Sequence, residues 1–303
     1  MLDKKIIFWG SPLFSLPSLQ VLFDLGIVAA VVTQADKPAG RNLKPQSSAV
    51  KIWAQEHNIK VLDPLKLDDN FILELKKLLP ATFVIVAYGR IIKDQVLSLS
   101  ELPAINIHPS LLPILRGPSP IQTTLLNGQK ETGVSLMQLD AQMDHGPILA
   151  QVPVNIFDND DYFTLSERLA NVGADLLQKN ISDYLAAKIE AKAQDDSKAT
   201  ICKLINKEDG LITWQETSAN ILNKIRAFKL WPGTYTKIAG LDLIISEAII
   251  TNIRLKPAEI LIRDNKLFIG TQDFALEITK LKPANKKLMS APEFIRGYQN
   301  KLK

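Results

Sequence analysis

The fold is decided by KKIIFWGSPLF, residues 4–14, in which a short apolar run stops at Gly10 and Pro12. An apolar run of this length, rich in β-branched and aromatic residues, predicts a buried strand, and the proline marks the place where a helix would begin. Four further runs of this kind are IVAAVVT (27–33), KVL (60–62), TFVIVAY (82–88) and AINIH (104–108).

Longer stretches with helical periodicity separate these runs, such as residues 17–25 and 49–57. Alternating strands and helices predict an α/β fold with a mostly parallel, doubly wound, Rossmann-like sheet, in which ligands bind at the carboxyl ends of the strands. The first strand-to-helix turn, GSPLF, lacks the G-x-G-x-x-G pattern, so a dinucleotide is not the expected ligand.

The rest of the chain predicts a second, smaller domain. Two strands (132–139 and 149–156) and a long amphipathic helix (161–188) complete the first domain. A polar stretch follows, and then a helix at 218–228 and short strands at 241–250, 259–263, 266–270 and 275–281. Short strands with turns favour a small OB-like β-barrel. The predicted divisions are a catalytic domain at 1–188, a linker at 189–206 and a barrel domain at 207–303.

Charge and cysteine content limit the possible partners and compartment. The net charge is +4, but residues 200–303 hold 17 Lys plus Arg against 10 Asp plus Glu, which suggests a polyanionic partner for this part. A basic face with no nucleic-acid role is the alternative. The single cysteine, Cys202, cannot form an internal disulfide. The sequence shows neither a signal peptide nor an apolar run of membrane-spanning length, so we expect a cytoplasmic protein with no membrane partner.

Polar side chains lie at the end of the predicted strand 104–108. Asn106 and His108 are two residues apart and therefore project from the same face of the strand. Histidine titrates near neutral pH, an asparagine amide can donate to a developing oxyanion, and Pro109 favours extended backbone at His108. The pair could instead only cap the following turn. Asp144, in the loop QMDHGP, could orient the imidazole or could be an ordinary turn aspartate.

Other chemistries find less support in the sequence. His108, Asp144 and His145 include the ligand types of a zinc site, but they have no characteristic short spacing and no thiolate beside them. The chain has no G-x-S-x-G, P-loop or C-x-x-C pattern. The residues alone therefore favour an acyl-transfer or amide-type site that needs no metal.

The motifs carry a resemblance to a known family. NIHPSLLPILRGPSPI (106–121) followed by TGVSLMQLDAQMDHGPIL (132–149) resembles the 10-formyltetrahydrofolate-dependent formyltransferases. The resemblance extends over nearly the whole chain through FWGSPLF, TQADKPAGR, VAYGRII, RAFKLWPGT and KKLMSAPEF. It implies that Asn106, His108 and Asp144 are catalytic. It also implies that 10-formyltetrahydrofolate is the formyl donor, bound beside Ser110, Leu111, Leu112 and Pro113.

Two departures from the family pattern lie beside this site. Pro109 replaces the usual glycine after the histidine, and RGPSPI replaces RGAAPI, with Pro118 and Ser119. Both changes are expected to affect loop geometry and to leave the catalytic assignment unchanged.

Members of the family differ in the molecule that accepts the formyl group, so the acceptor remains to be assigned. The resemblance favours the α-amine of methionyl initiator tRNA as the acceptor, which is formylated for translation initiation. We expect the protein to be a monomer. Lys37, Arg41 and Lys44 in TQADKPAGRNLKPQ are the predicted tRNA contacts beside the active site, with residues 207–303 as a tRNA-binding domain. A solvated basic loop is the alternative interpretation. An aminosugar formyltransferase and an inactive RNA-binding module are the competing functions.

Overall fold

The computed structural model describes residues 4–39 and 44–301. The chain forms two compact units. The first comprises Met1–Gly117, Glu131–Asn155 and Ser166–Ile201, and the second comprises Pro118–Lys130, Ile156–Leu165 and Cys202–Lys303. Cys202 is buried. Among the described residues, no helix has the length and apolar character needed to cross a membrane.

The first unit is built on a seven-stranded sheet in the order β5-β2-β1-β6-β7-β8-β9. Its strands are β1 (Ile6–Gly10), β2 (Val28–Val32), β5 (Lys60–Leu62), β6 (Thr82–Val86), β7 (Ile105–His108), β8 (Glu131–Gln138) and β9 (Ile148–Asn155). The pairs from β5 to β7 are parallel, whereas β8 and β9 are antiparallel additions. Every residue of β1 and β6 is buried, because helices cover both faces of a doubly wound sheet.

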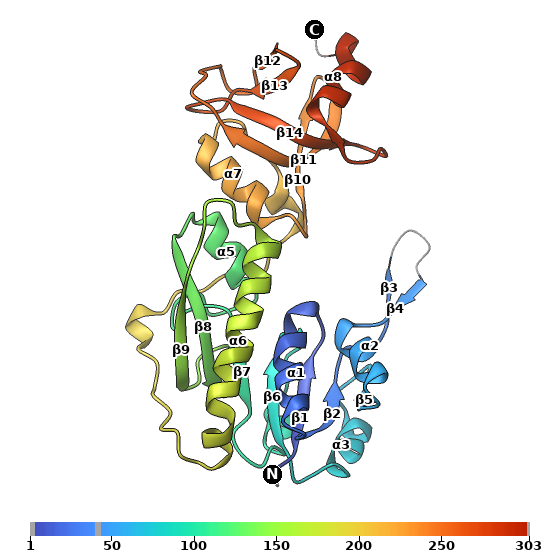
Figure 1. Ribbon diagram of the computed structural model, residues 1–303, viewed down its shortest axis with the longest axis vertical. Helices are drawn as coiled ribbons and strands as arrows, with labels where there is room; N and C mark the ends of the chain where they lie inside the picture. The colour runs from blue at the N-terminus through green and yellow to red at the C-terminus, as the bar shows by residue number, and fades with distance from the viewer. Residues whose placement is uncertain (1–3, 40–43, 302–303) are drawn as a thin grey trace. The chain divides into compact units, whose positions relative to one another are not determined.

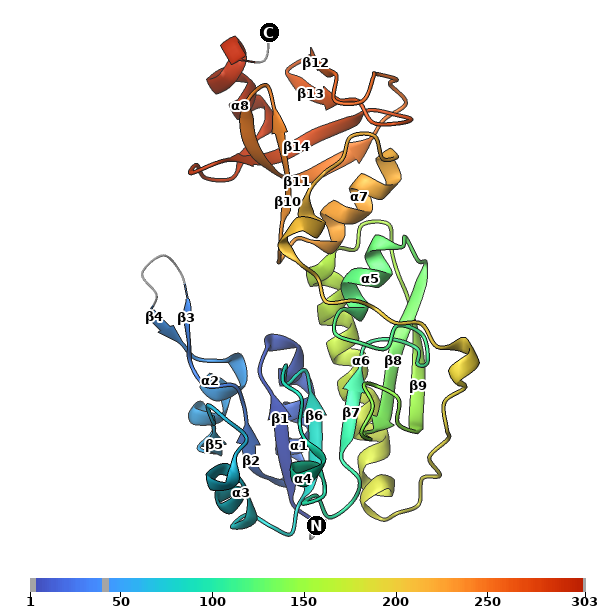
Figure 2. The ribbon, with the colours of Figure 1, turned by 180° about the vertical axis from the view of Figure 1, so that it is seen from behind.

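Helices lie on both faces of this sheet. They are α1 (Leu16–Asp24), α2 (Ala49–Glu56), α3 (Asp69–Lys76), α4 (Asp94–Leu97) and α6 (Tyr162–Leu185). α1 and α6 lie in front of the sheet in Figure 1, and α4 lies in front of it in the reverse view of Figure 2. Phe71 of α3 and Val96 of α4 share one hydrophobic core with Trp9 of β1 and Phe83 of β6. A short hairpin, β3 (Lys37–Ala39) and β4 (Lys44–Gln46), is a separate two-stranded sheet.

The turn after β1 shows why the chain needs glycine at position 10. A Cβ on Gly10 would lie 2.8 Å from both the Phe8 ring and the Ser15 hydroxyl oxygen. Ser15 in turn donates to the carbonyl of Val86, 2.6 Å away at the end of β6. The glycine therefore lets the start of the first helix pack close to the carboxyl ends of β1 and β6.

The second unit is dominated by one antiparallel sheet in the order β10-β11-β14-β13-β12, with β15 paired to β14. The strands are β10 (Thr234–Ile238), β11 (Leu241–Ile250), β12 (Ile260–Arg263), β13 (Lys266–Ile269), β14 (Leu276–Pro283) and β15 (Met289–Ser290). The helices of this unit include α5 (Pro120–Leu126), α7 (Ser218–Ala227) and α8 (Ala291–Tyr298). The predicted α/β part, followed by a smaller antiparallel β part, is confirmed.

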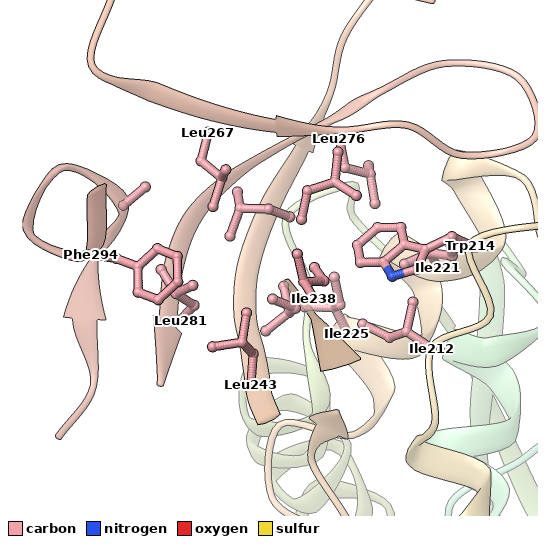
Figure 3. Close-up of a cluster of buried hydrophobic side chains, with 14 of the residues drawn as sticks. Ile212, Trp214, Ile221, Ile225, Ile238, Leu243, Leu267, Leu276, Leu281 and Phe294 are labelled. Atoms are coloured by element: carbon pink, nitrogen blue, oxygen red, sulfur yellow. The ribbon is translucent and has the colours of Figure 1, made fainter. Parts of the chain in front are cut away.

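The core of the second unit joins the sheet to two helices. Figure 3 shows Ile221 and Ile225 of α7, Leu243 of β11 and Phe294 of α8 among the buried apolar side chains. Trp214 belongs to the same cluster, and its indole N–H donates to the Thr236 hydroxyl at 3.0 Å. This buried polar atom is therefore satisfied, as a dry core requires.

Candidate active site

Asn106 and His108 project from the same face of β7. In the parallel pairing Asn106 lies opposite Ile85, whose side chain belongs to the core that contains α3 and α4. Ile107 points the other way, because a Cβ on Gly173 of α6 would lie 2.8 Å from its side chain. Asn106 and His108 are only 9% and 4% exposed. Two polar side chains thus lie buried at the carboxyl end of the sheet, where this fold binds ligands.

The His108 ring is held from two sides. Its Nε2 lies 2.9 Å from the carbonyl oxygen of Leu115, and its Nδ1 lies 3.6 Å from Oδ2 of Asp144. Because a carbonyl can only accept, Nε2 carries a hydrogen and donates it. Nδ1 therefore faces the carboxylate at a distance longer than a hydrogen bond, and the two groups form an ion pair only when Nδ1 also carries a proton. The structure thus brings His108 and Asp144 together, and their catalytic role remains a prediction.

Asp144 is fixed by its own backbone and by one amide donor. Its φ is +50°, in the left-handed region that aspartate tolerates better than most residues. The backbone N–H of Gly117 donates to Oδ2 of Asp144 at 2.8 Å. The same oxygen therefore receives this hydrogen bond and faces the imidazole.

Asn106 differs from its neighbours in being without a partner. Within residues 4–39 and 44–301, no group forms a hydrogen bond with its side-chain amide, although the residue is buried. The residue is 9% exposed, and its amide is not among the fully buried side-chain atoms that lack a partner, so solvent or a ligand can reach it. The amide is therefore free to bind a carbonyl or an oxyanion.

The loop after β7 contains the four predicted folate residues. Ser110 is buried, and its hydroxyl donates to the Ile114 carbonyl within the loop. Leu112 is also buried, whereas Leu111 packs against Gly133 and Pro113 is half-buried. Ser110 and Leu112 therefore contribute mainly to the shape of this loop. The proposed folate contact of each residue remains a prediction.

Two residues that the sequence analysis missed support this loop. The fully buried Ser135 of β8 donates to the Ser110 carbonyl at 2.6 Å and accepts from the Leu112 N–H at 3.0 Å. The Gln151 amide of β9 donates to Ser135 Oγ at 2.7 Å and to the Leu112 carbonyl at 2.9 Å. A polar serine inside the apolar run TGVSLM was the available signal.

His145 turns away from the His108 and Asp144 pair. Its Nδ1 lies 2.6 Å from Oδ2 of Asp140, and its Nε2 lies 3.5 Å from Oδ2 of Asp196, which also binds Arg116. The hydrogen bond to Asp140 raises the pKa of His145 above its usual 6.5, against an opposing effect of burial. In the described part of the chain, no three His, Cys, Asp or Glu residues are arranged to hold a metal ion.

This raised pKa gives a testable pH dependence. A group with a raised folded pKa contributes stability in full below its unfolded pKa of 6.5, and the contribution disappears as the pH rises through the folded value. We therefore expect His145→Gln to lower the free energy of unfolding at acidic pH and to approach wild type at alkaline pH. Urea unfolding across the pH range measures this difference. Asp140→Asn should flatten it, and a difference that grows with pH would contradict the assignment.

The predicted tRNA contacts are only partly described. Lys37 begins β3, is exposed, and its ammonium donates to the side chain of Gln34. Lys44 begins β4, where its backbone pairs with Ala39. Arg41 lies outside the described residues. The hairpin thus places the backbones of Lys37 and Lys44 on paired strands, and their contact with tRNA remains a prediction.

Comparison with known proteins identifies the class of this fold and site. A family model described as formyl transferase matches residues 18–181, and a model described as formyl transferase, C-terminal domain, matches residues 204–299. The chain belongs to the formyl transferase family, as its motifs predicted.

Full-length relatives define the branch of the family. Similar curated proteins include the methionyl-tRNA formyltransferase of Caldanaerobacter subterraneus subsp. tengcongensis, 38% identical, with 97% of each chain covered. That of Thermodesulfovibrio yellowstonii is 39% identical, with 98% of this chain and 96% of the relative covered.

Solved structures share the fold. The N-formyltransferase from Helicobacter canadensis, in complex with folinic acid and dTDP-3-aminofucose, is 24% identical with a TM-score of 0.69, covering 91% of this chain and 98% of that one. The methionyl-tRNA formyltransferase from Clostridium thermocellum is 16% identical with a TM-score of 0.56, covering 82% and 94%. At these identities the likeness supports the fold alone.

Proposed function

We propose that the protein transfers the formyl group of 10-formyltetrahydrofolate to the α-amino group of methionyl initiator tRNA, the modification used in translation initiation. The observation that carries this proposal is the near-complete match to methionyl-tRNA formyltransferases, in a chain that groups His108 and Asp144 beside Asn106. We further propose that it acts as a cytoplasmic monomer.

The geometry supports a role for each catalytic residue. The methionyl amine attacks the formyl carbon, and the unpaired Asn106 amide donates to the oxyanion that forms. Nδ1 of His108 is the ring nitrogen with a free lone pair, and a proton taken up there would lie beside the Asp144 carboxylate. The intermediate collapses when the C–N bond to the folate breaks. The folate nitrogen takes a proton, which leaves formyl-methionyl-tRNA and tetrahydrofolate.

The deciding experiment offers the protein two acceptors. Purified protein and 10-formyltetrahydrofolate are incubated with methionyl initiator tRNA or with a dTDP-linked aminosugar, and the formylated product is measured. We expect formyl-methionyl-tRNA from the first mixture. Formylation of the sugar alone would favour the aminosugar function. tRNA binding without transfer to either acceptor would favour the RNA-binding module.

We infer that cations of the second unit contact the tRNA backbone. Lys286 and Lys287 are adjacent and exposed in the turn after β14. Replacing both with alanine should weaken tRNA binding, and each lost phosphate contact should flatten the dependence of log affinity on log salt by about one unit. Arg41→Ala should also weaken tRNA binding while leaving folate binding unchanged.

A matched control separates phosphate contact from net charge. Lys76 and Lys77 are an adjacent, exposed pair at the end of α3 in the first unit, so replacing both with alanine removes the same charge elsewhere. tRNA affinity measured against salt should match wild type for this control. The same affinity and slope for wild type, Arg41→Ala and the Lys286 and Lys287 double variant would remove these residues from the binding surface.

A further inference from the structure

Gln194 lies in the stretch 189–206, which composition predicted to be a linker, yet its side chain connects both loops of the active site. Its amide nitrogen donates to the carbonyls of Asp144 at 2.9 Å and Gly146 at 2.8 Å. Its amide oxygen accepts from Nε of Arg116 at 2.9 Å. Both N–H groups and the oxygen of this one amide are thus hydrogen-bonded. They connect two loops whose nearest bonded residues, Arg116 and Asp144, are 28 residues apart in the sequence.

These bonds act on the part of the backbone that directs the Asp144 carboxylate. The carbonyls of Asp144 and Gly146 flank His145, so the two hydrogen bonds fix the turn in which Asp144 has its positive φ. Gly146 itself is tightly packed, since a Cβ there would lie 2.0 Å from the Gln138 carbonyl oxygen. The turn is therefore held from both sides, by Gln194 and by β8.

The other loop is fixed by the same side chain. Arg116, which donates to Gln194, is followed directly by Gly117, whose N–H binds the Asp144 carboxylate. Arg116 also forms an ion pair with Asp196 at 2.7 Å. Gln194 therefore positions both the carboxylate of Asp144 and the amide that orients it.

The stretch around Gln194 is anchored at both ends, so its side chain does not depend on a flexible backbone. Lys192 exchanges two backbone hydrogen bonds with Ile148, at 2.7 and 2.8 Å. Thr200 accepts through its hydroxyl from the Leu115 N–H at 2.8 Å and through its carbonyl from the Arg116 N–H at 2.9 Å. Leu115 is also the residue whose carbonyl holds His108.

We propose that Gln194 is a positioning residue for formyl transfer, which keeps the Asp144 carboxylate facing His108. This inference rests on the proposed function for its kinetic consequences, but the effect of Gln194 on the Asp144 loop can be measured without a substrate.

The sharpest variant is Gln194→Glu. A carboxylate has nearly the same shape and keeps the contact with Arg116, but it cannot donate to the carbonyls of Asp144 and Gly146. The backbone N–H of Gly117 should then exchange with solvent faster, because its acceptor is displaced. Hydrogen exchange of the peptide that contains Gly117 measures this in the free enzyme. Unchanged exchange would overturn the proposal, whatever the protein formylates.

Kinetics then test whether the effect passes through Asp144. Gln194→Glu should lower kcat about tenfold or more, because a small misplacement of a catalytic group is costly, while KM for the folate changes little. In an Asp144→Asn background the same substitution should change kcat less than about twofold, since interacting residues are not additive. An equal loss in both backgrounds would show that Gln194 acts elsewhere.

Gln142→Glu is the matched control. It introduces the same charge into the Asp144 loop at an exposed side chain that bonds to nothing in the described structure. Its Gly117 exchange and its kcat should equal those of wild type. If wild-type protein proved inactive with methionyl-tRNA, the proposed function would fail, and hydrogen exchange alone would still decide the role of Gln194.

Discussion

Replacing His108 with alanine is expected to lower the rate of formyl transfer about a hundredfold, the usual contribution of a positioned general acid or base. The buried ring offers Nδ1, which lies 3.6 Å from the Asp144 carboxylate, as the proton acceptor. Alanine removes this acceptor and leaves the Asp144 carboxylate with the hydrogen bond from the Gly117 N–H but no imidazole to face. Because the lost interaction belongs to the transition state, kcat should fall while folate affinity changes little.

Single-turnover formylation with saturating folate and methionyl-tRNA measures this effect, and equilibrium titration measures folate binding. His57→Ala is the matched control, since His57 follows α2 and lies outside the candidate site. Its ring stacks on Trp53 with the ring centroids 3.9 Å apart. Asn106→Ala should also lower kcat by at least about tenfold through loss of the oxyanion donor. Near-wild-type turnover by both site variants would remove the pair from the mechanism.

The sequence predicted some strands and missed others, and the difference follows from where each strand lies. β1, β2 and β6 are parallel strands covered by helices, so their residues form continuous apolar runs that are visible in the sequence. The β3 and β4 hairpin was not predicted as strands, because each strand has three residues and contains a proline. Single-sequence patterns do not reveal such short pairs.

In the candidate site, local spacing could predict only which residues share a face of one strand. Asn106 and His108 were paired by their two-residue separation on a strand. The approach of Asp144 depends on the antiparallel pairing of β7 with β8 and β8 with β9, which no local pattern encodes. The residues alone left Asp144 open between an imidazole partner and an ordinary turn aspartate, and the resemblance to a known family favoured the first.

Supporting residues were missed for a different physical reason. Gln194 lies among lysine, aspartate and alanine residues, a composition typical of solvated linkers. Its neighbours in the sequence do point to solvent, but its own amide finds three partners in loops that the sheet brings near. Tertiary contacts of a single polar side chain leave almost no trace in composition.

The second large effect is expected from Phe294→Ala in the second unit. Phe294 of α8 is fully buried, stacks on Tyr298 with ring centroids 4.7 Å apart, and packs in the core with Leu281 and Leu267 (Figure 3). Removing a buried phenylalanine ring costs about 3–5 kcal/mol through lost apolar burial and the cavity left behind. That is a large part of the 5–15 kcal/mol that typically stabilises a whole domain.

Because Phe294 lies in the core of the second unit, we expect the loss of stability to be concentrated there. Hydrogen exchange in denaturant should show β11 and β14 opening earlier than in wild type, while β1 and β6 stay protected. If the basic second unit binds the tRNA, tRNA affinity should fall and folate affinity should stay the same. Leu288→Ala, at a side chain of the same unit that is 54% exposed, should leave exchange and both affinities unchanged. Equal destabilisation of both sheets by Phe294→Ala would instead mean that the two units unfold together.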